Sequence, residues 1–122
     1  MGWKMKVPPR INAQEGPNMR SLANFPMQAN GSEMLRVAVI KAHELDVEIC
    51  ATVHDALLIQ APLNRIDKAA LDTQQAMEEA SGLILKGFRL KTDIDIVKWP
   101  HRYFDERGSR MWEKIMKLLP QL

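Results

Sequence analysis

Apolar residues dominate one extended stretch near the middle of the chain. Residues 48–62 are rich in β-branched and aliphatic side chains, and the polar pair His54-Asp55 interrupts them. This pattern predicts a β-hairpin with the pair at its turn. The pair is unusual there, because tight turns normally contain Gly, Pro or Asn, and none is nearby. An Asp between two apolar strands is expected to lose hydration, so that either a divalent cation or a hydrogen-bonded turn compensates it.

Two further stretches alternate between apolar and polar positions. In residues 89–97 the alternation is regular, and it predicts a half-buried antiparallel strand that ends at Trp99-Pro100. In residues 3–7 the alternation is weaker, and it predicts a short strand or an arm that stops at Pro8-Pro9.

Apolar residues recur at steps of three and four in three other stretches, and each is predicted to be a helix. The first is Gly31–Leu45, with a broad apolar face; the second is Leu63–Ser81, with Gly82 as its C-terminal stop; the third is Ser109–Leu119. Residues 8–24 contain several Pro and Gly residues and are predicted to form a loop. Together these elements predict an α+β fold, a small antiparallel sheet with helices packed on one face.

Length and composition predict one soluble globular unit. A chain of 122 residues can bury one core, and its 46% apolar content is ordinary for such proteins. We expect a single partial domain over residues 1–122, with an arm and loop over 1–24 and the helices and strands over 25–122. No apolar run approaches the roughly 20 residues that span a bilayer, so we expect no membrane partner and a cytoplasmic location. The single cysteine, Cys50, excludes an internal disulfide and is expected to be a core residue of a strand.

Charge is distributed unevenly along the chain. Residues 1–20 carry four basic and one acidic side chain, residues 21–85 carry four and nine, and residues 86–122 carry nine and five. A basic arm beside an acidic middle fits a surface where phosphates and metal ions meet, and it fits a solvated surface without a partner equally well.

Two blocks of residues, taken together, resemble a known family. Asn24, Pro26 and Gln28 form an Asn-x-Pro-x-Gln stretch, Arg20 precedes it by four residues, and Val53-His54-Asp55 follows about two dozen residues later. This order and spacing resemble the C-terminal part of the palm of family A DNA polymerases, the family of the bacterial repair polymerase and its phage relatives. In that family the first block opens a long helix and the second forms a hairpin. The resemblance extends roughly from residue 2 to residue 105.

The resemblance implies a role for the hairpin in nucleotidyl transfer. Two Mg²⁺ ions would hold the attacking 3′ hydroxyl and the leaving pyrophosphate, with Asp55 as a metal ligand. His54 would lie beside the primer terminus and help to align it. Ala56 departs from the family, since many relatives carry Glu there. From the residues alone, Asp55 could instead cap its own turn, and His54 could simply fill space at the sheet.

The resemblance also implies that Arg20, Asn24 and Gln28 contact the primer-template duplex, partly through its minor groove. Amide side chains can donate to the purine N3 and pyrimidine O2 acceptors that every base pair presents there, and Arg20 can pair with a phosphate. The alternatives are helix capping for Asn24 and a solvated surface charge for Arg20. Asp93 and Asp95 match no catalytic position of the family, and we interpret them as the solvent side of their strand.

Other parts that a family A polymerase needs have no counterpart in these residues. They are an earlier palm Asp that shares both metals and the fingers helix that holds the incoming nucleotide. We therefore expect a fragment or a truncated reading frame whose partners are the missing N-terminal segments, and which cannot polymerise DNA alone. We also expect self-association through exposed apolar surface or a bare sheet edge.

Two other functions compete with the one that this resemblance implies. One is a non-catalytic nucleic-acid-binding or interaction module. The other is a His-Asp metal phosphohydrolase, which would use His43, His54, Asp55 and Asp93. The fold of that enzyme class is helical, whereas Thr52-Val53-His54 has strand character. The phosphohydrolase hypothesis is therefore less favoured.

Overall fold

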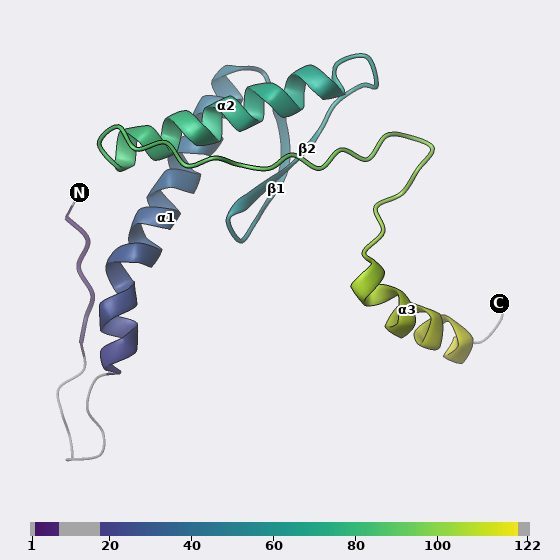
Figure 1. Ribbon diagram of the computed structural model, residues 1–122, viewed down its shortest axis with the longest axis horizontal. Coiled ribbons are helices and arrows are strands. Elements are labelled where there is room, and N and C mark those ends of the chain that lie inside the picture. Colours follow the sequence, from purple (N-terminus) through teal and green to yellow (C-terminus); the bar gives the residue numbers. More distant parts are fainter. Residues whose placement is uncertain (1, 8–17, 120–122) are drawn as a thin grey trace.

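A computed structural model (Figure 1) describes residues 2–7 and 18–119. Along the chain it contains α1 (Met19–Glu44), β1 (Glu48–Val53), β2 (Ala56–Gln60), α2 (Ile66–Ile84) and α3 (Glu106–Leu118). The two strands form an antiparallel sheet, and α1 and α2 pack against each other and against that hairpin. The predicted α+β class is therefore confirmed.

Helix α1 begins earlier than the sequence pattern predicted. Asn18 is its N-cap, and its side-chain oxygen accepts from the backbone N–H groups of Arg20 at 3.0 Å and Ser21 at 3.3 Å. The loop prediction is thus wrong for residues 19–24, whereas residues 8–17 lie outside the described part. Pro26 lies inside the helix, although it cannot donate to the carbonyl four residues earlier. The expectation that Asn24 opens the helix is therefore wrong too.

Small side chains form the core where α1 meets α2. The buried apolar residues in the described part are five alanines and one valine, and no large side chain is fully buried there. Ala42, Val47 and Ala76 form the central cluster, and Ile49, Leu57 and Ile59 of the hairpin pack against it. The ammonium group of Lys41 donates to Glu79 at 2.8 Å across the two helices, and this hydrogen bond lowers the pKa of the Glu79 carboxyl.

The hairpin was predicted correctly, but one of its residues lies elsewhere than expected. Ile49 pairs with Ile59 and Ala51 pairs with Leu58, so Cys50 is the extra residue of a β-bulge. Cys50 is exposed. The prediction that it lies in the core is therefore wrong, because the bulge removes it from the alternation of the strand.

The predicted strand over residues 89–97 is wrong. This segment is extended, but it runs back along α2 without pairing to the sheet (Figure 1). Side chains of α2 bind its backbone instead: the Ser81 hydroxyl accepts from the Leu90 N–H at 2.8 Å, and the Gln74 amide donates to the Thr92 carbonyl at 2.5 Å. These bonds occupy backbone groups that a β-ladder would otherwise use.

Helix α2 also differs from its predicted bounds. It begins at Ile66 and passes through Gly82, which was predicted to end it. The reversal comes at Lys86 and Gly87, whose φ angles are 53° and 104°. Gly82 serves close packing, since a Cβ there would lie 3.1 Å from the Arg89 Cγ of the returning segment.

The two ends of the described chain extend away from the core. Residues 3–7 form an arm without strand pairing, and the Trp3 indole donates to Glu33 of α1 at 3.1 Å. Helix α3 stands apart from the other elements (Figure 1). It begins three residues earlier than predicted, because Asp105 caps it by accepting from the Arg107 N–H at 2.9 Å. The bonds from Arg107 lower the pKa of the Asp105 carboxyl.

The molecule exposes an unusually large surface. Its accessible area is 10771 Å², whereas a compact monomer of this mass would expose roughly 6,700 Å². Large apolar side chains are exposed on every helix and strand. None of the helices in the described residues is both long and apolar enough to cross a bilayer.

Candidate functional site

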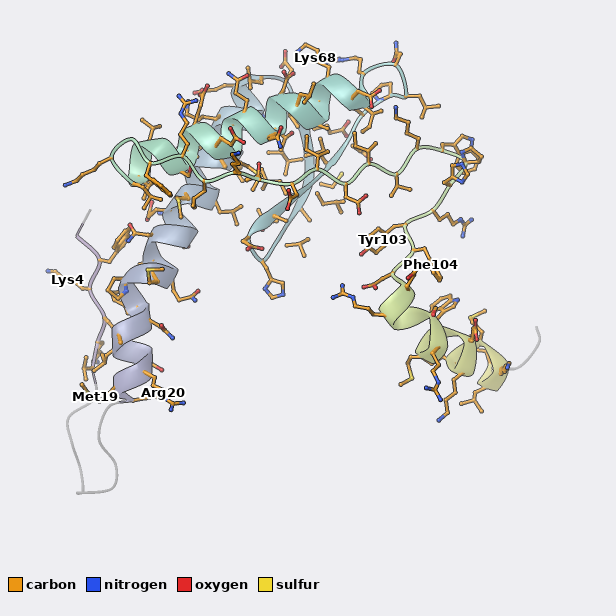
Figure 2. All side chains as sticks on the ribbon, viewed as in Figure 1. Lys4, Met19, Arg20, Lys68, Tyr103 and Phe104 are labelled. Carbon is orange, nitrogen blue, oxygen red and sulfur yellow. The ribbon has the colours of Figure 1, made fainter. Side chains whose placement is uncertain are left out.

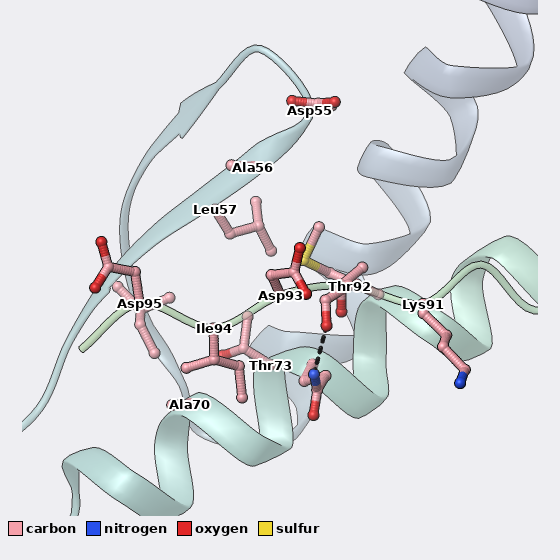
Figure 3. Close-up of a pocket in the computed structure, with 13 residues that line it drawn as sticks. Asp55, Ala56, Leu57, Ala70, Thr73, Lys91, Thr92, Asp93, Ile94 and Asp95 are labelled. Atoms are coloured by element: carbon pink, nitrogen blue, oxygen red, sulfur yellow. Dashed lines mark hydrogen bonds between the residues drawn. The ribbon is translucent and has the colours of Figure 1, made fainter. Parts of the chain in front are cut away.

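The His54-Asp55 pair forms a two-residue turn at the tip of the hairpin. Val53 pairs with Ala56 on either side of it, and both turn residues are exposed. Figure 3 shows Asp55 at the tip, on the side of the hairpin that faces α1. The expectation that Asp55 loses hydration is therefore wrong, because solvent reaches its carboxyl group. The geometry leaves its oxygens accessible to a ligand.

The backbone at His54 is in the left-handed region, with φ of 54°. This conformation costs an L-residue roughly 1–2 kcal/mol relative to the usual regions, although His tolerates it better than most. Gly or Asn would normally occupy such a position in a hairpin. A costly residue retained at an exposed turn is consistent with a functional use of its side chain.

We expect His54→Gly to raise the free energy of unfolding by roughly 0.5–1 kcal/mol, because Gly adopts positive φ without strain and the exposed imidazole loses little packing. His54→Val should lower it by about 1 kcal/mol, since β-branched residues resist this conformation. Urea unfolding followed by circular dichroism measures both changes. A destabilised Gly variant would show that the imidazole itself supports the fold.

Asp55 lines two cavities. The first, of about 380 Å³, is also lined by Asp93 and Asp95 of the returning segment and by side chains of α2 (Figure 3). The second, of about 310 Å³, is lined on its far side by Gly31 and Leu35 of α1. In Figure 3 the Asp93 carboxylate lies between the segment and the hairpin tip, whereas that of Asp95 points away from Asp55.

The metal expected from the resemblance can be tested against this arrangement. Within residues 2–7 and 18–119, no three His, Cys, Asp or Glu side chains come close enough to hold a metal ion. Asp55 thus offers one accessible carboxylate, and the described residues do not assemble a site for two ions. The same finding counts against the phosphohydrolase set, because His43 lies near the end of α1 and does not join the hairpin pair.

The three residues expected to contact DNA share one face of α1. Arg20, Asn24 and Gln28 follow at four-residue steps and are all exposed. Figure 2 shows Arg20 at the start of the helix, on the side opposite the arm that carries Lys4. Successive helix residues are rotated by about 100°, so Gly31 and Leu35 lie on the same face of α1 as these three residues. Both line the second cavity, which Asp55 also lines. One helix face therefore connects the polar residues to the hairpin tip.

Two neighbours of Asp55 were not anticipated from the sequence. Asp93 was interpreted as a solvent-facing residue and is exposed, and it also lines the cavity beside the hairpin tip. Thr92 lines both cavities, and its hydroxyl oxygen is buried without a hydrogen-bond partner in the described residues. The alternation of residues 89–97 could indicate which side chains share a side, but not which element they would face.

Comparison with known proteins supplies an independent observation. No family model matches the chain, and no solved structure does. DNA polymerase I of Lactococcus lactis is 28% identical over 90 residues, which are 66% of this chain and 10% of that protein. The thermostable DNA polymerase I of Thermus thermophilus is 31% identical over 75 residues, which are 58% of this chain and 9% of that protein.

These matches cover most of this chain but about a tenth of each relative's length. They agree with the resemblance to the polymerase family, whereas the assignment to the palm and to phage relatives stays a prediction. The chain is thus similar in sequence to a short segment of bacterial DNA polymerase I.

Proposed function

We propose that this chain is the C-terminal palm segment of a family A DNA polymerase. In this proposal the polar face of α1 contacts the primer-template duplex, and Asp55 is one ligand of the catalytic metals. The main support for this proposal is the continuous face of α1, which joins Arg20, Asn24 and Gln28 to the cavity lined by Asp55. The similarity to DNA polymerase I supports it.

The spacing of the polar face suits a duplex. From Arg20 to Gln28 the helix rises about 12 Å, since each residue adds about 1.5 Å. This distance corresponds to between three and four base-pair steps of about 3.4 Å. Asn24 and Gln28 can donate to minor-groove acceptors that are present whatever the sequence, while Arg20 can neutralise a phosphate.

The hairpin would supply part of the chemistry. A carboxylate is the hard oxygen ligand that Mg²⁺ prefers, and a turn between two paired strands holds Asp55 in place. When bound, the two ions would stabilise the charge that develops on the attacking and leaving oxygens. His54, next to Asp55, would align the primer terminus. Because no three potential metal ligands gather among the described residues, polymerisation of deoxynucleoside triphosphates would require further polymerase segments.

Duplex binding by the purified chain tests the proposal directly. Fluorescence anisotropy with a labelled primer-template should show binding that weakens as salt rises, because phosphate contacts release counterions. Replacing Arg20, Asn24 and Gln28 together by Ala should weaken it by about 10- to 100-fold, given roughly 1–3 kcal/mol for such contacts. With Mg²⁺ and all four nucleotides added, the chain should bind the primer without extending it.

Arg36 provides the matched control. It has the same charge on the same helix, but it lies on the opposite side from Arg20 and pairs with Glu33 at 2.8 Å. Arg36→Ala should reduce affinity by less than about threefold, since one distant charge acts only through screened attraction. Equal losses for both faces would refute the proposed contact surface. Duplex binding without extension even after the remaining polymerase segments are supplied would favour the rival, a non-catalytic binding module.

A further inference from the structure

An apolar groove lies on the side of the hairpin away from α1. It has a volume of about 450 Å³, and its walls come from the hairpin, the first turns of α2 and the returning segment. Leu58, Ile96 and Val97 line it and are exposed at 56%, 36% and 42%. Exposed apolar walls of this kind are typical of surfaces that bind another protein segment.

Helix α3 carries a complementary surface. At about 100° per residue, its five large apolar side chains fall within an arc of about 160°. All of them are exposed, by 45% to 76%. They are Met111, Trp112, Ile115, Met116 and Leu118. A helix with one apolar side and no packing partner is typical of an element that docks into a groove.

We propose that α3 of one molecule docks into this groove of a second copy, and that the exchange is reciprocal. The charges favour such an arrangement. Asp93 and Asp95 line the groove, while the basic residues of α3 occupy an arc of about 80° next to its apolar side. These basic residues are Arg107, Arg110, Lys114 and Lys117.

The route of the chain favours a second copy over the molecule's own α3. Tyr103, three residues before α3 begins, itself lines the groove. From there the chain continues outward through Phe104, so that α3 stands apart from the hairpin (Figures 1 and 2). The connection thus occupies the end of the groove and carries the helix away from it. Exchange of an identical element between two copies is a low-cost route to a dimer.

The area that would be buried suits a stable dimer. Each apolar side chain of α3 removes on the order of 80 Å² from water. Five such residues on two helices, together with the groove walls that they cover, give roughly 1,600 Å², the usual size of a specific interface. The exchange would also cover part of the excess surface of the single chain.

The first test measures mass by light scattering on the full chain between about 1 and 100 μM. We expect two copies at the higher concentration. Ile115→Glu places a charge in the apolar arc and should weaken dimerisation at least ~100-fold. Glu113→Gln, on the polar side of the same helix, should leave it within about threefold. Circular dichroism would verify that both variants keep their helices. A single copy at 100 μM for the unaltered chain would overturn the proposal.

The second test identifies the occupant of the groove. In a Cys50→Ser background, molecules with Ile96→Cys are mixed with molecules carrying Met111→Cys, Ile115→Cys or Leu118→Cys in turn. We expect a disulfide between chains for at least one pair. If chains with both cysteines form only internal disulfides, the groove holds the molecule's own helix, and the proposal is wrong. It is also wrong if the chain stays single and binds phosphatidylcholine–phosphatidylglycerol vesicles through α3.

Discussion

Replacing Ala76 by Asp is expected to unfold the packed part of the chain. Ala76 is 1% exposed and lies in the central cluster with Ala42 and Val47. A carboxylate there would be buried without a partner, which costs about 3–5 kcal/mol. Small domains have only about 5–15 kcal/mol in total, and this core consists mainly of alanines. Circular dichroism should show loss of the helical signal, or a urea midpoint shifted strongly downward.

Leu71→Asp is the matched control for Ala76→Asp. Leu71 lies on the same helix but is 60% exposed, so a carboxylate there remains hydrated. We expect its effect to stay within about 1 kcal/mol. If both variants lost stability equally, the contact between α1 and α2 would not be the core of this molecule.

If the proposed function is correct, Asp55→Asn should have the largest effect on catalysis. The test requires a complete enzyme, such as the Thermus thermophilus polymerase with this chain grafted in place of the similar segment. Metal ions contribute several kcal/mol to stabilisation of the transition state, and each 1.36 kcal/mol is a factor of ten. Loss of a metal-ligating carboxylate should therefore reduce the primer-extension rate of the graft at least ~10³-fold.

Asp93→Asn supplies the control for Asp55→Asn in the same graft. Both carboxylates line one cavity, but only Asp55 matches the family's hairpin. We expect the Asp93 variant to retain its rate within about threefold. Equal losses would indicate that the cavity acts through its summed charge, and retention of activity by Asp55→Asn would remove this residue from the mechanism.

Local patterns predicted most elements of this fold, and errors arose where distant contacts decided the outcome. The spacing of apolar residues within residues 31–119 predicted the hairpin and the three helices. Residues 89–97 alternate like a strand, yet Ser81 and Gln74 of α2 bind their backbone. Gly82 was predicted to end a helix, but it allows Arg89 to approach. These contacts join α2 to the segment that follows it, so the pattern within either segment does not show them.

The candidate site could be predicted in part. The position of Asp55 at the tip of a hairpin followed from the sequence and is confirmed. The common face of Arg20, Asn24 and Gln28 did not, because the predicted helix began after all three. The place of Asp93 beside the hairpin tip depends on how the chain returns over α2, which no single segment specifies. The roles of these residues stay predictions.

Pro26 gives α1 an uneven internal stability. Because it supplies no N–H to the carbonyl of Leu22, the turns before it rely on the Asn18 cap and on local bonds. Those turns carry Arg20 and Asn24, so their amide hydrogens should exchange with solvent sooner than those beyond Pro26. A bound duplex would then order these turns. The loss of their conformational entropy would make the free energy of binding less favourable.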